Sequence, residues 1–452
     1  MGSAAAVTKA PLKTTESARV SAPMFPLIAI GESAGGLEAM EQFFEPVPPE
    51  CGAAFIVVQH LDPTQAGMLV ELLQRCTTLT VVQVSDGMRI EPNHVYVIPP
   101  AADLQVLHDV LHLSEPNQAR GLRLPIDIFF RSLADDRGAD SIAVVLSGMG
   151  SDGTLGLRAI KEQAGAGFVQ APESAKFDSM PRSAIDSDLA DSVAPADQLY
   201  GKIAEYLRHI PTVARREEHE LSASDRIAVE KVVLLLRTQT GHDFSQYKLS
   251  TLSRRIKRRM GLHHLKGVNE YVRYVRENPP EGQLLFRELL IGVTSFFRDP
   301  DVWDQVRTEM LPELLSAKPS GEAVRAWVTA CSTGEEAYSL AIAFREACDA
   351  LGGAKPPPVM IFATDLDPDA IARARVGFFP LNIAADVPPS LLQRYFVQSD
   401  RGYRVVKEVR EMVVFATQNM LMDPPFTKLD LITCRNLLIY LTAELQRKVM
   451  PL

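Results

Sequence analysis

The sequence has few cysteines and no paired cysteine motif. Its five cysteines are scattered along 452 residues, their number is odd, and none forms a C-x-x-C pair. This pattern argues against a cysteine-based metal site and suits a reducing cytoplasm. We therefore expect a cytoplasmic protein without a bound metal.

Long apolar runs and an excess of positive charge are also absent. No apolar run approaches the roughly 20 residues that span a bilayer, and residues 1–24 lack the apolar core of a secretion signal. The formal net charge of -9 argues against nucleic-acid binding by the surface as a whole. We expect a disordered tail over residues 1–24, no membrane insertion and no nucleic-acid partner.

The length and the apolar content predict more than one domain. A chain of 452 residues with 46% hydrophobic residues is too long for one ordinary domain and can bury large cores. Short apolar runs alternate with helical stretches over residues 25–209, which predicts an α/β domain with a parallel sheet. A charge cluster without apolar periodicity predicts a linker at residues 210–221. The predicted strands of the first domain are Pro26–Ile30, Ala54–Gln59, Val95–Ile98, Ile142–Leu146 and Gly167–Gln170.

A serine flanked by glycines follows the first predicted strand, in the stretch LIAIGESAGG at residues 27–36. Glycines on both sides of Ser33 allow a sharp turn from the strand into a helix. Such a turn exposes the hydroxyl at the end of the sheet and directs free helix N–H groups into the same space. The pattern is typical of a nucleophile elbow, and a plain strand-to-helix turn is the alternative.

Two residue types that a serine nucleophile needs follow other strands of the same sheet. His60 comes directly after Ala54–Gln59, and Asp152 lies in a glycine-rich loop after Ile142–Leu146. Because ligands bind beyond the carboxyl ends of parallel strands, we expect Ser33, His60 and Asp152 to converge. The imidazole then accepts the serine proton, and the carboxylate fixes its tautomer. For His60 taken alone, a structural or surface role is the alternative.

Four motifs of the first half resemble the catalytic domain of the chemotaxis protein-glutamate methylesterase family: GESAGG, VVQHLDP, LSGMGSDG and QAPESAKFDSMPRSAI. The resemblance covers about residues 25–207 and gives the serine, histidine and aspartate the roles of nucleophile, base and orienting acid. It also implies an oxyanion hole of main-chain N–H groups near Ala34 and Met149. Ala34 replaces the family's usual hydroxyl residue, which removes a side-chain contact but no backbone donor. Only a tail precedes Phe25, so we expect no receiver domain before the esterase.

The second half contains another strand-turn-helix unit, AWVTACSTGEEAYSLA at residues 326–341. The next predicted strand, Val359–Ala363, leads to Asp365, and a carboxylate at this place in a βαβ unit is suited to ribose hydroxyls. The G-x-G-x-x-G fingerprint of dinucleotide sites is missing, and acids follow the single Gly334. The loop therefore suits a nucleoside that carries an amine, such as S-adenosylmethionine.

The motifs ACSTGEEAYSLA, VTSFFRDP, ATDLDPDAIARARVG and ITCRNLLIYL resemble the chemotaxis receptor glutamate methyltransferase family, over about residues 221–452. The resemblance implies S-adenosylmethionine as cofactor. Gly292 and Ala337 replace the family's usual asparagine and proline, and the first change removes one possible hydrogen bond. The chain stops at Leu452, where the family needs two further strands, so we expect a truncated sheet with an exposed edge. The implied cofactor residues are Thr294, Arg298, Glu335, Asp365, Asn419, Met420, Arg435 and Asn436.

A basic amphipathic helix is predicted within a helical segment at residues 222–290. Apolar residues recur at helical spacing, and basic residues without acidic neighbours occupy the other faces. We expect its arginines to face the open side of the cofactor site and to draw acidic receptor helices toward it. A solvated face and docking against the esterase domain are the alternatives. The substrate-binding arginines in this hypothesis are Arg254, Arg255, Arg258 and Arg259.

Together the two halves predict one chain that adds and removes methyl groups on receptor glutamates. The expected fold is α/β, with two doubly wound domains and the methyltransferase domain at residues 291–452. Glutamine deamidation is a further reaction open to the esterase, and the expected partners are methyl-accepting chemotaxis receptors or similar glutamate-rich coiled coils. One alternative is a signalling scaffold whose two enzyme-like domains serve as binding modules. Another is a small-molecule esterase joined to an unrelated methyltransferase.

Overall fold

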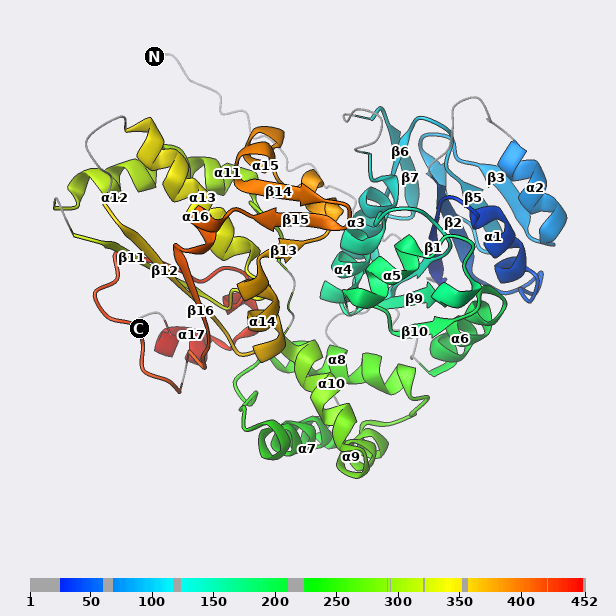
Figure 1. Ribbon diagram of the computed structural model, residues 1–452. Coiled ribbons are helices and arrows are strands. Elements are labelled where there is room, and N and C mark those ends of the chain that lie inside the picture. The colour runs from blue at the N-terminus through cyan, green and yellow to red at the C-terminus, as the bar shows by residue number, and fades with distance from the viewer. Residues whose placement is uncertain are drawn as a thin grey trace, which may run out of the picture.

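The computed structural model has three parts. The described residues are 25–59, 68–116, 123–187, 189–209, 223–290, 292, 294–319, 322–351, 357–420 and 422–449. Figure 1 shows a first α/β unit on the right, a second α/β unit on the left, and a helical cluster below and between them. The predicted fold class, with two parallel sheets, is confirmed. The predicted tail and linker, residues 1–24 and 210–221, lie outside the described residues.

The first unit contains a seven-stranded parallel sheet. Its strands are β1 (Leu27–Glu32), β2 (Ala54–Gln59), β3 (Thr80–Gln83), β5 (His94–Val97), β8 (Ser141–Val145), β9 (Ala166–Gln170) and β10 (Ser192–Ala194). They lie in the order β10-β9-β8-β1-β2-β5-β3. The central strands are buried apolar runs, as expected when helices cover both faces. The chain adds β2, β3 and β5 on one side of β1, and then β8, β9 and β10 on the other side. The carboxyl ends of β1 and β8 therefore form the switch point at which such sheets bind ligands.

Six helices cover the two faces of this sheet. They are α1 (Gly36–Phe44), α2 (Met68–Cys76), α3 (Pro125–Arg137), α4 (Thr154–Glu162), α5 (Ser179–Asp186) and α6 (Ala196–His209). Helices α1, α2 and α6 pack on one face, and α3, α4 and α5 pack on the other. A small antiparallel sheet packs against α3 and consists of β4 (Met88–Arg89), β6 (Asp103–Leu107) and β7 (Val110–Ser114).

The helical cluster has a core of its own. It consists of α7 (Ala223–Thr240), α8 (Leu249–Leu262), α9 (Val268–Glu277) and α10 (Pro279–Leu290). Leu252, Ile256 and Met260 of α8 are buried together with Val232 and Tyr271. The apolar face of the predicted basic helix is therefore a packed core face, because these positions recur at helical spacing.

The second unit contains a four-stranded parallel sheet in the order β16-β12-β11-β17. The strands are β11 (Val324–Thr329), β12 (Val359–Asp365), β16 (Val413–Thr417) and β17 (Leu431–Thr433). A second small antiparallel sheet is made of β13 (Phe378–Phe379), β14 (Phe396–Ser399) and β15 (Gly402–Val405). The helices are α11 (Pro300–Gln305), α12 (Leu311–Ala317), α13 (Glu335–Ala350), α14 (Pro368–Val376), α15 (Pro389–Tyr395), α16 (Lys407–Arg410) and α17 (Ala443–Val449). The first strand, β11, lies between the second and the last, so its carboxyl end is a switch point.

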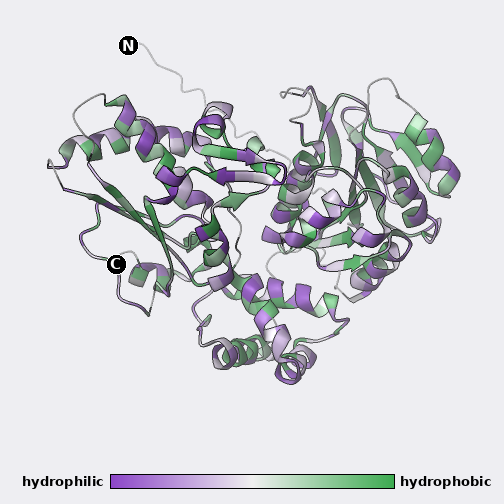
Figure 2. Cartoon of the chain, viewed as in Figure 1, coloured by the Kyte–Doolittle hydropathy of each residue, from purple (hydrophilic) through white to green (hydrophobic). Residues whose placement is uncertain are grey.

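Figure 2 shows that the strands of both sheets are mostly hydrophobic, whereas the surrounding helices alternate between hydrophobic and hydrophilic positions. Charged contacts join the first unit to the other two parts: Arg131 of α3 lies 3.6 Å from Asp386 of the second unit, and Arg258 of α8 forms an ion pair with Asp191. Helix α4 contacts both the helical cluster and the second unit. Among the described residues, no helix combines the length and the apolar character needed to cross a bilayer.

Candidate functional site

Ser33 lies in a sharp turn between β1 and α1. Gly35 has a φ of 72°, a left-handed conformation that glycine adopts without strain, and it caps the start of α1. The Ser33 N–H donates to the carbonyl oxygen of Ser147 at 3.0 Å. The turn at Ser33 is therefore tied to the loop that follows β8. Its geometry agrees with the elbow expected from the sequence, and the role of Ser33 as nucleophile stays a prediction.

Asp152 lies in the loop after β8, at the same sheet edge as Ser33. Its buried carboxylate accepts main-chain N–H groups of Ile126, Asp127 and Gly153 at 3.1, 2.9 and 2.8 Å. Two of these donors belong to the first turn of α3, where the helix dipole favours a negative charge. Asp152 is thus held firmly next to the elbow.

His60, the predicted base, lies outside the described residues. Strand β2 ends one residue before it and pairs in parallel with β1, with Gln59 opposite Glu32. The structure therefore brings two of the three predicted residues to one edge of the sheet and leaves the third untested.

Gly148 allows the aspartate loop to approach the serine closely. A Cβ atom at this position would lie 3.0 Å from the Ser33 Cβ and 2.1 Å from the Met180 Sδ. The Gly148 N–H donates to the Phe177 carbonyl at 3.0 Å, and the Gly148 carbonyl accepts from Met180 N–H at 3.1 Å. The QAPESAKFDSM segment after β9 thus braces the loop, a role that sequence reasoning did not assign to it.

The two predicted oxyanion residues flank this contact. Ser147 Oγ donates to the Ala34 carbonyl at 2.9 Å, which fixes the main chain just after the serine. Met149 follows Gly148 and has an exposed side chain. An oxyanion hole at Ala34 and Met149 stays a prediction.

Two buried acids near the elbow were not anticipated. Glu32 is fully buried, and within the described part of the chain neither carboxylate oxygen has a hydrogen-bond partner, so burial raises its pKa well above the ordinary value of 4.5. Asp127 accepts from the Gly156 N–H at 2.6 Å, and burial together with the charge of Asp152 raises its pKa. The only sequence signal for Glu32 is an acid at the end of an apolar strand.

The predicted cofactor residues of the second unit surround the carboxyl edge of its sheet. Glu335 begins α13 after β11, Asp365 ends β12, Asn419 and Met420 follow β16, Arg435 and Asn436 follow β17, and Thr294 and Arg298 precede α11. Hydrogen bonds tie four of these loops together. Ser332 N–H donates to Asp365 Oδ2 at 2.8 Å, Ser332 Oγ donates to the Gly292 carbonyl at 3.0 Å, and Gln418 N–H donates to the Asp365 carbonyl at 3.0 Å.

Arg435 and Met420 also contact other parts of the second unit. Arg435 donates to the Arg298 carbonyl at 2.8 Å and to the Asp299 carboxylate at 2.5 Å, which ties the TCRN loop to the VTSFFRDP loop. Met420 packs against the small apolar cluster around α17. Asn436 is exposed.

Strained backbone concentrates in the same loops. Ala330, Ser332, Phe297, Asp299 and Asn436 have left-handed conformations, with φ between 48° and 59°. Each such residue costs on the order of 1–3 kcal/mol, and strain of this kind gathers at active sites and ligand clamps. All five lie in three of the loops that carry the predicted cofactor residues, which supports a binding site at this edge.

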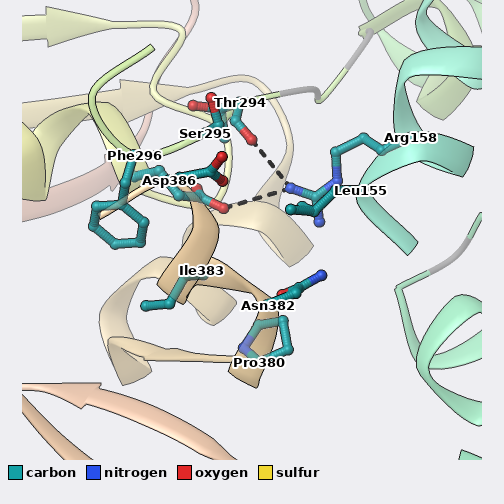
Figure 3. Close-up of a pocket in the computed structure, with 10 residues that line it drawn as sticks. Leu155, Arg158, Thr294, Ser295, Phe296, Pro380, Asn382, Ile383 and Asp386 are labelled. Carbon is teal, nitrogen blue, oxygen red and sulfur yellow. Dashed lines mark hydrogen bonds and ion pairs between the residues drawn. The ribbon is translucent and has the colours of Figure 1, made fainter. Parts of the chain in front are cut away.

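Helix α4 of the first unit reaches the rim of this site, as Figure 3 shows. Arg158 Nη1 donates to the Thr294 carbonyl at 3.1 Å and lies 3.7 Å from Glu335 Oε1. The cavity between the units here has a volume of about 10 Å³. It is lined by Leu155, Arg158, Thr294, Ser295, Phe296, Glu335, Pro380, Asn382, Ile383 and Asp386.

The arginines of α8 do not form the expected open basic face. Arg255, Arg258 and Arg259 are 2%, 2% and 9% exposed, and Arg254 is half-buried. Arg255 donates to the main-chain carbonyls of the last two residues of α4. The prediction of an exposed steering surface is wrong for the three buried residues, and the alternative, docking against the first unit, is what the structure shows.

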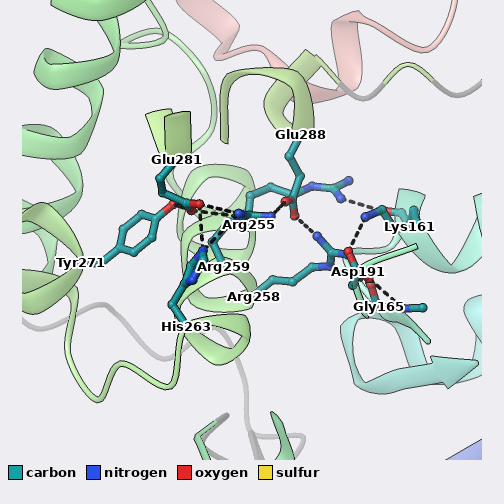
Figure 4. Close-up of polar contacts among 11 residues, drawn as sticks. Lys161, Gly165, Asp191, Arg255, Arg258, Arg259, His263, Tyr271, Glu281 and Glu288 are labelled. Carbon is teal, nitrogen blue, oxygen red and sulfur yellow. Dashed lines mark hydrogen bonds and ion pairs between the residues drawn. The ribbon is translucent and has the colours of Figure 1, made fainter. Parts of the chain in front are cut away.

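Acids from other elements of the fold form ion pairs with Arg258 and Arg259 (Figure 4). Arg258 forms ion pairs with Asp191 of the first unit and Glu288 of α10, and its Nε donates to the Gly165 carbonyl at 2.7 Å. Arg259 forms an ion pair with Glu281 of α10. These partners were invisible to the sequence pattern because the fold alone brings them next to α8.

Comparison with known proteins finds family models that match both halves. The family model described as CheB methylesterase matches residues 28–203. The model described as CheR methyltransferase, all-alpha domain, matches residues 227–290, and that described as CheR methyltransferase, SAM binding domain, matches residues 292–451. The last match identifies S-adenosylmethionine as the cofactor of that domain.

Several relatives are similar over part of their length. An uncharacterized 104.1 kDa protein of Rhodobacter capsulatus is 39% identical over 402 residues, which cover 84% of this chain and 42% of that protein. A protein-glutamate methylesterase/protein-glutamine glutaminase of Shewanella is 35% identical over 40% of this chain and 52% of that protein. This chain thus spans about half the length, or less, of these relatives. The crystal structure of the Thermotoga maritima CheB methylesterase catalytic domain shares 29% identity, covers 40% of this chain and 98% of that one, and has a TM-score of 0.38.

Proposed function

Because the chain joins a methylesterase domain of the CheB type to a methyltransferase domain of the CheR type, we propose that it modifies glutamate side chains of chemotaxis receptors in both directions. The methyltransferase half esterifies the glutamate, and the esterase half hydrolyses the ester. Deamidation of glutamine at the same sites is a further reaction of the esterase half, and the name of the Shewanella relative supports it.

The observation that carries the esterase proposal is the contact between the elbow and the aspartate loop. Ser33 and Asp152 lie on either side of the switch point between β1 and β8, joined by the bond from Ser33 N–H to Ser147. In the proposed reaction Ser33 Oγ attacks the ester carbonyl while His60 accepts its proton. The bond to the methoxy group then breaks, methanol takes the proton, and water releases glutamate from the acylated serine.

The residues of the second unit fit S-adenosylmethionine. Each carboxylate oxygen of Asp365 accepts one main-chain N–H, from Ser332 and Asp367, and keeps a lone pair for a ribose hydroxyl. Glu335 and Arg298 offer the charges that match an ammonium and a carboxylate group. When bound, the cofactor supplies an electrophilic methyl group, and the chain's own residues position it for a glutamate oxygen.

The proposed partners are methyl-accepting receptors or similar glutamate-rich coiled coils, and the proposed location is the cytoplasm. All five cysteines are free thiols, which suits a reducing compartment. The scaffold alternative is not favoured, because both halves match enzyme families and the elbow retains its serine.

Two variants test the two halves separately. Ser33→Ala is expected to abolish both methanol release from methylated receptor and labelling by a fluorophosphonate, while binding of S-adenosylhomocysteine is unchanged. Asp365→Ala is expected to weaken that binding by about tenfold or more, because it removes an acceptor of two hydroxyl groups, and to leave hydrolysis intact. Ser399→Ala, at an exposed serine of β14, is the control. Unchanged hydrolysis in Ser33→Ala would refute the esterase assignment.

A further inference from the structure

Helix α4 presents two opposite charges to the rim of the cofactor site. Arg158 and Glu162 are four residues apart and therefore lie on one side of the helix. Arg158 Nη1 is 3.7 Å from Glu335 Oε1, and Glu162 Oε1 is 3.7 Å from Arg298 Nη1. Arg158 also donates to the Thr294 carbonyl at 3.1 Å. Three residues proposed to hold the cofactor are thus engaged by one helix of the other enzyme unit.

The chemistry of these pairs matches one part of S-adenosylmethionine. Its amino-acid part carries one ammonium and one carboxylate group, which complement the carboxylate of Glu335 and the guanidinium of Arg298. Helix α4 offers the same two charges to the same two residues. The space left beside Arg158, about 10 Å³, corresponds to a single water molecule. An amino-acid group therefore has no room at this point while α4 is docked.

The docking of α4 is a built contact rather than a chance surface pair. Arg255 donates to the carbonyls of Lys161 and Glu162, the last two residues of α4, where carbonyl groups lack partners within the helix itself. Lys161 Nζ and Arg258 both form ion pairs with the buried Asp191 (Figure 4). The helical cluster therefore holds the C-terminal end of α4, while Arg158 and Glu162 of the same helix face the cofactor site.

We propose that α4 is an internal competitor of the cofactor. Arg158 and Glu162 occupy the subsite for the amino-acid part of S-adenosylmethionine, so docking of the esterase unit and binding of the cofactor exclude each other. This inference rests on the proposed function, because it takes Glu335 and Arg298 as cofactor residues. The buried Glu335 fits this view, since it exchanges one cationic partner for another when α4 leaves.

The test compares two nucleosides by calorimetry on the full chain. S-adenosylhomocysteine carries the amino-acid part, and 5′-methylthioadenosine lacks it. In Arg158→Ala with Glu162→Gln, S-adenosylhomocysteine is expected to bind about tenfold more tightly, because apparent affinity falls with the fraction of undocked protein. The affinity for 5′-methylthioadenosine is expected to stay within about twofold. Arg182→Gln, on the exposed side of α5, is the matched control and leaves both affinities unchanged.

The outcomes separate this inference from the function on which it rests. If the double variant binds S-adenosylhomocysteine no better than the parent, or more weakly, α4 is not a competitor and the inference is overturned, while the cofactor assignment stands. If neither nucleoside binds to the parent or the variant, the proposed cofactor site itself is refuted. A second measurement uses the parent protein, so that it does not depend on whether the variant folds. Addition of S-adenosylhomocysteine is expected to speed amide exchange in α4. Unchanged exchange would overturn the proposal that α4 competes with the cofactor.

Discussion

Arg258 is the buried charge on which the contact between α8 and the first unit depends. Its side chain is 1% exposed, forms ion pairs with Asp191 and Glu288, and donates to the Gly165 carbonyl at 2.7 Å. Burial alone lowers the pKa of this guanidinium, but the two carboxylates outweigh burial and raise it above the ordinary value. Arg258→Met keeps the length of the side chain and removes its charge, so it isolates the electrostatic part of the contact.

The size of the effect follows from the groups left behind. Removal of one partner of a buried ion pair costs about 3–5 kcal/mol, because the other charge stays buried without compensation. Asp191 keeps Lys161 at 2.5 Å, and Glu288 keeps Arg259 at 3.9 Å. Because each carboxylate keeps another cation nearby, we expect Arg258→Met to lower the free energy of opening this contact by about 3 kcal/mol, the lower end of that range.

Hydrogen exchange of α4 and α8, followed by mass spectrometry, measures this opening directly. A loss of about 3 kcal/mol corresponds to exchange that is roughly a hundredfold faster. Lys257→Met on the same helix is the control and is expected to change stability by less than about 0.5 kcal/mol. Arg258→Met combined with Asp191→Asn is expected to cost at least about 1 kcal/mol less than the sum of the single changes. Unchanged exchange in α4 would show that the ion pairs do not hold the units together.

Three further changes test the first unit. Glu32→Gln is expected to stabilise the protein at neutral pH, because the amide stays neutral where ionisation of the buried carboxyl group costs free energy. Because burial raises the pKa of Glu32 above 4.5, the gain is absent below that pH and grows as pH rises; an unchanged melting temperature at pH 8 would contradict this. Burial raises the pKa of Asp191, but its cationic partners outweigh burial and lower it to about 2. It therefore contributes about 2–3 kcal/mol above pH 4 that is lost as pH falls toward 2, and an acid titration of Asp191→Asn followed by circular dichroism checks this. Gly148→Ala places a methyl group against Ser33 and is expected to slow fluorophosphonate labelling by about tenfold to a hundredfold; labelling at the parental rate would refute the close approach.

The strands around the sites could be predicted because they leave a local signal. Buried parallel strands are short continuous apolar runs, and β2 (Ala54–Gln59) was predicted to the residue. The strands β3 and β10 were missed, since they are short strands at the two edges of the sheet and carry few apolar residues. Motif spacing placed Ser33 and Asp152 at one sheet edge, because both follow central strands.

The arginines of α8 could not be placed from the sequence for a different physical reason. A helical run of basic residues shows which positions share a face, but not which acids meet that face in the fold. The partners of Arg258 come from the residue before β10 and from α10, whose approach depends on how the three parts of the chain pack. The same limit applies to Glu32, whose burial under the start of α1 arises from the close contact with Gly36.

Helix α4 connects the two sites mechanically as well as electrostatically. It begins two residues after Asp152, its Gly156 N–H donates to Asp127 Oδ1 at 2.6 Å, and a Cβ at Gly156 would lie 2.5 Å from Phe130. It therefore packs too closely on α3 to shift alone, and the first turn of α3 supplies two of the N–H donors that hold Asp152.

Coupling between sites is reciprocal: if docking of α4 weakens cofactor binding tenfold, bound cofactor weakens docking by the same factor. Cofactor that displaces α4 would thus also disturb α3, whose N–H groups hold Asp152 of the esterase site. In this way the methyltransferase and esterase activities of one chain could alternate.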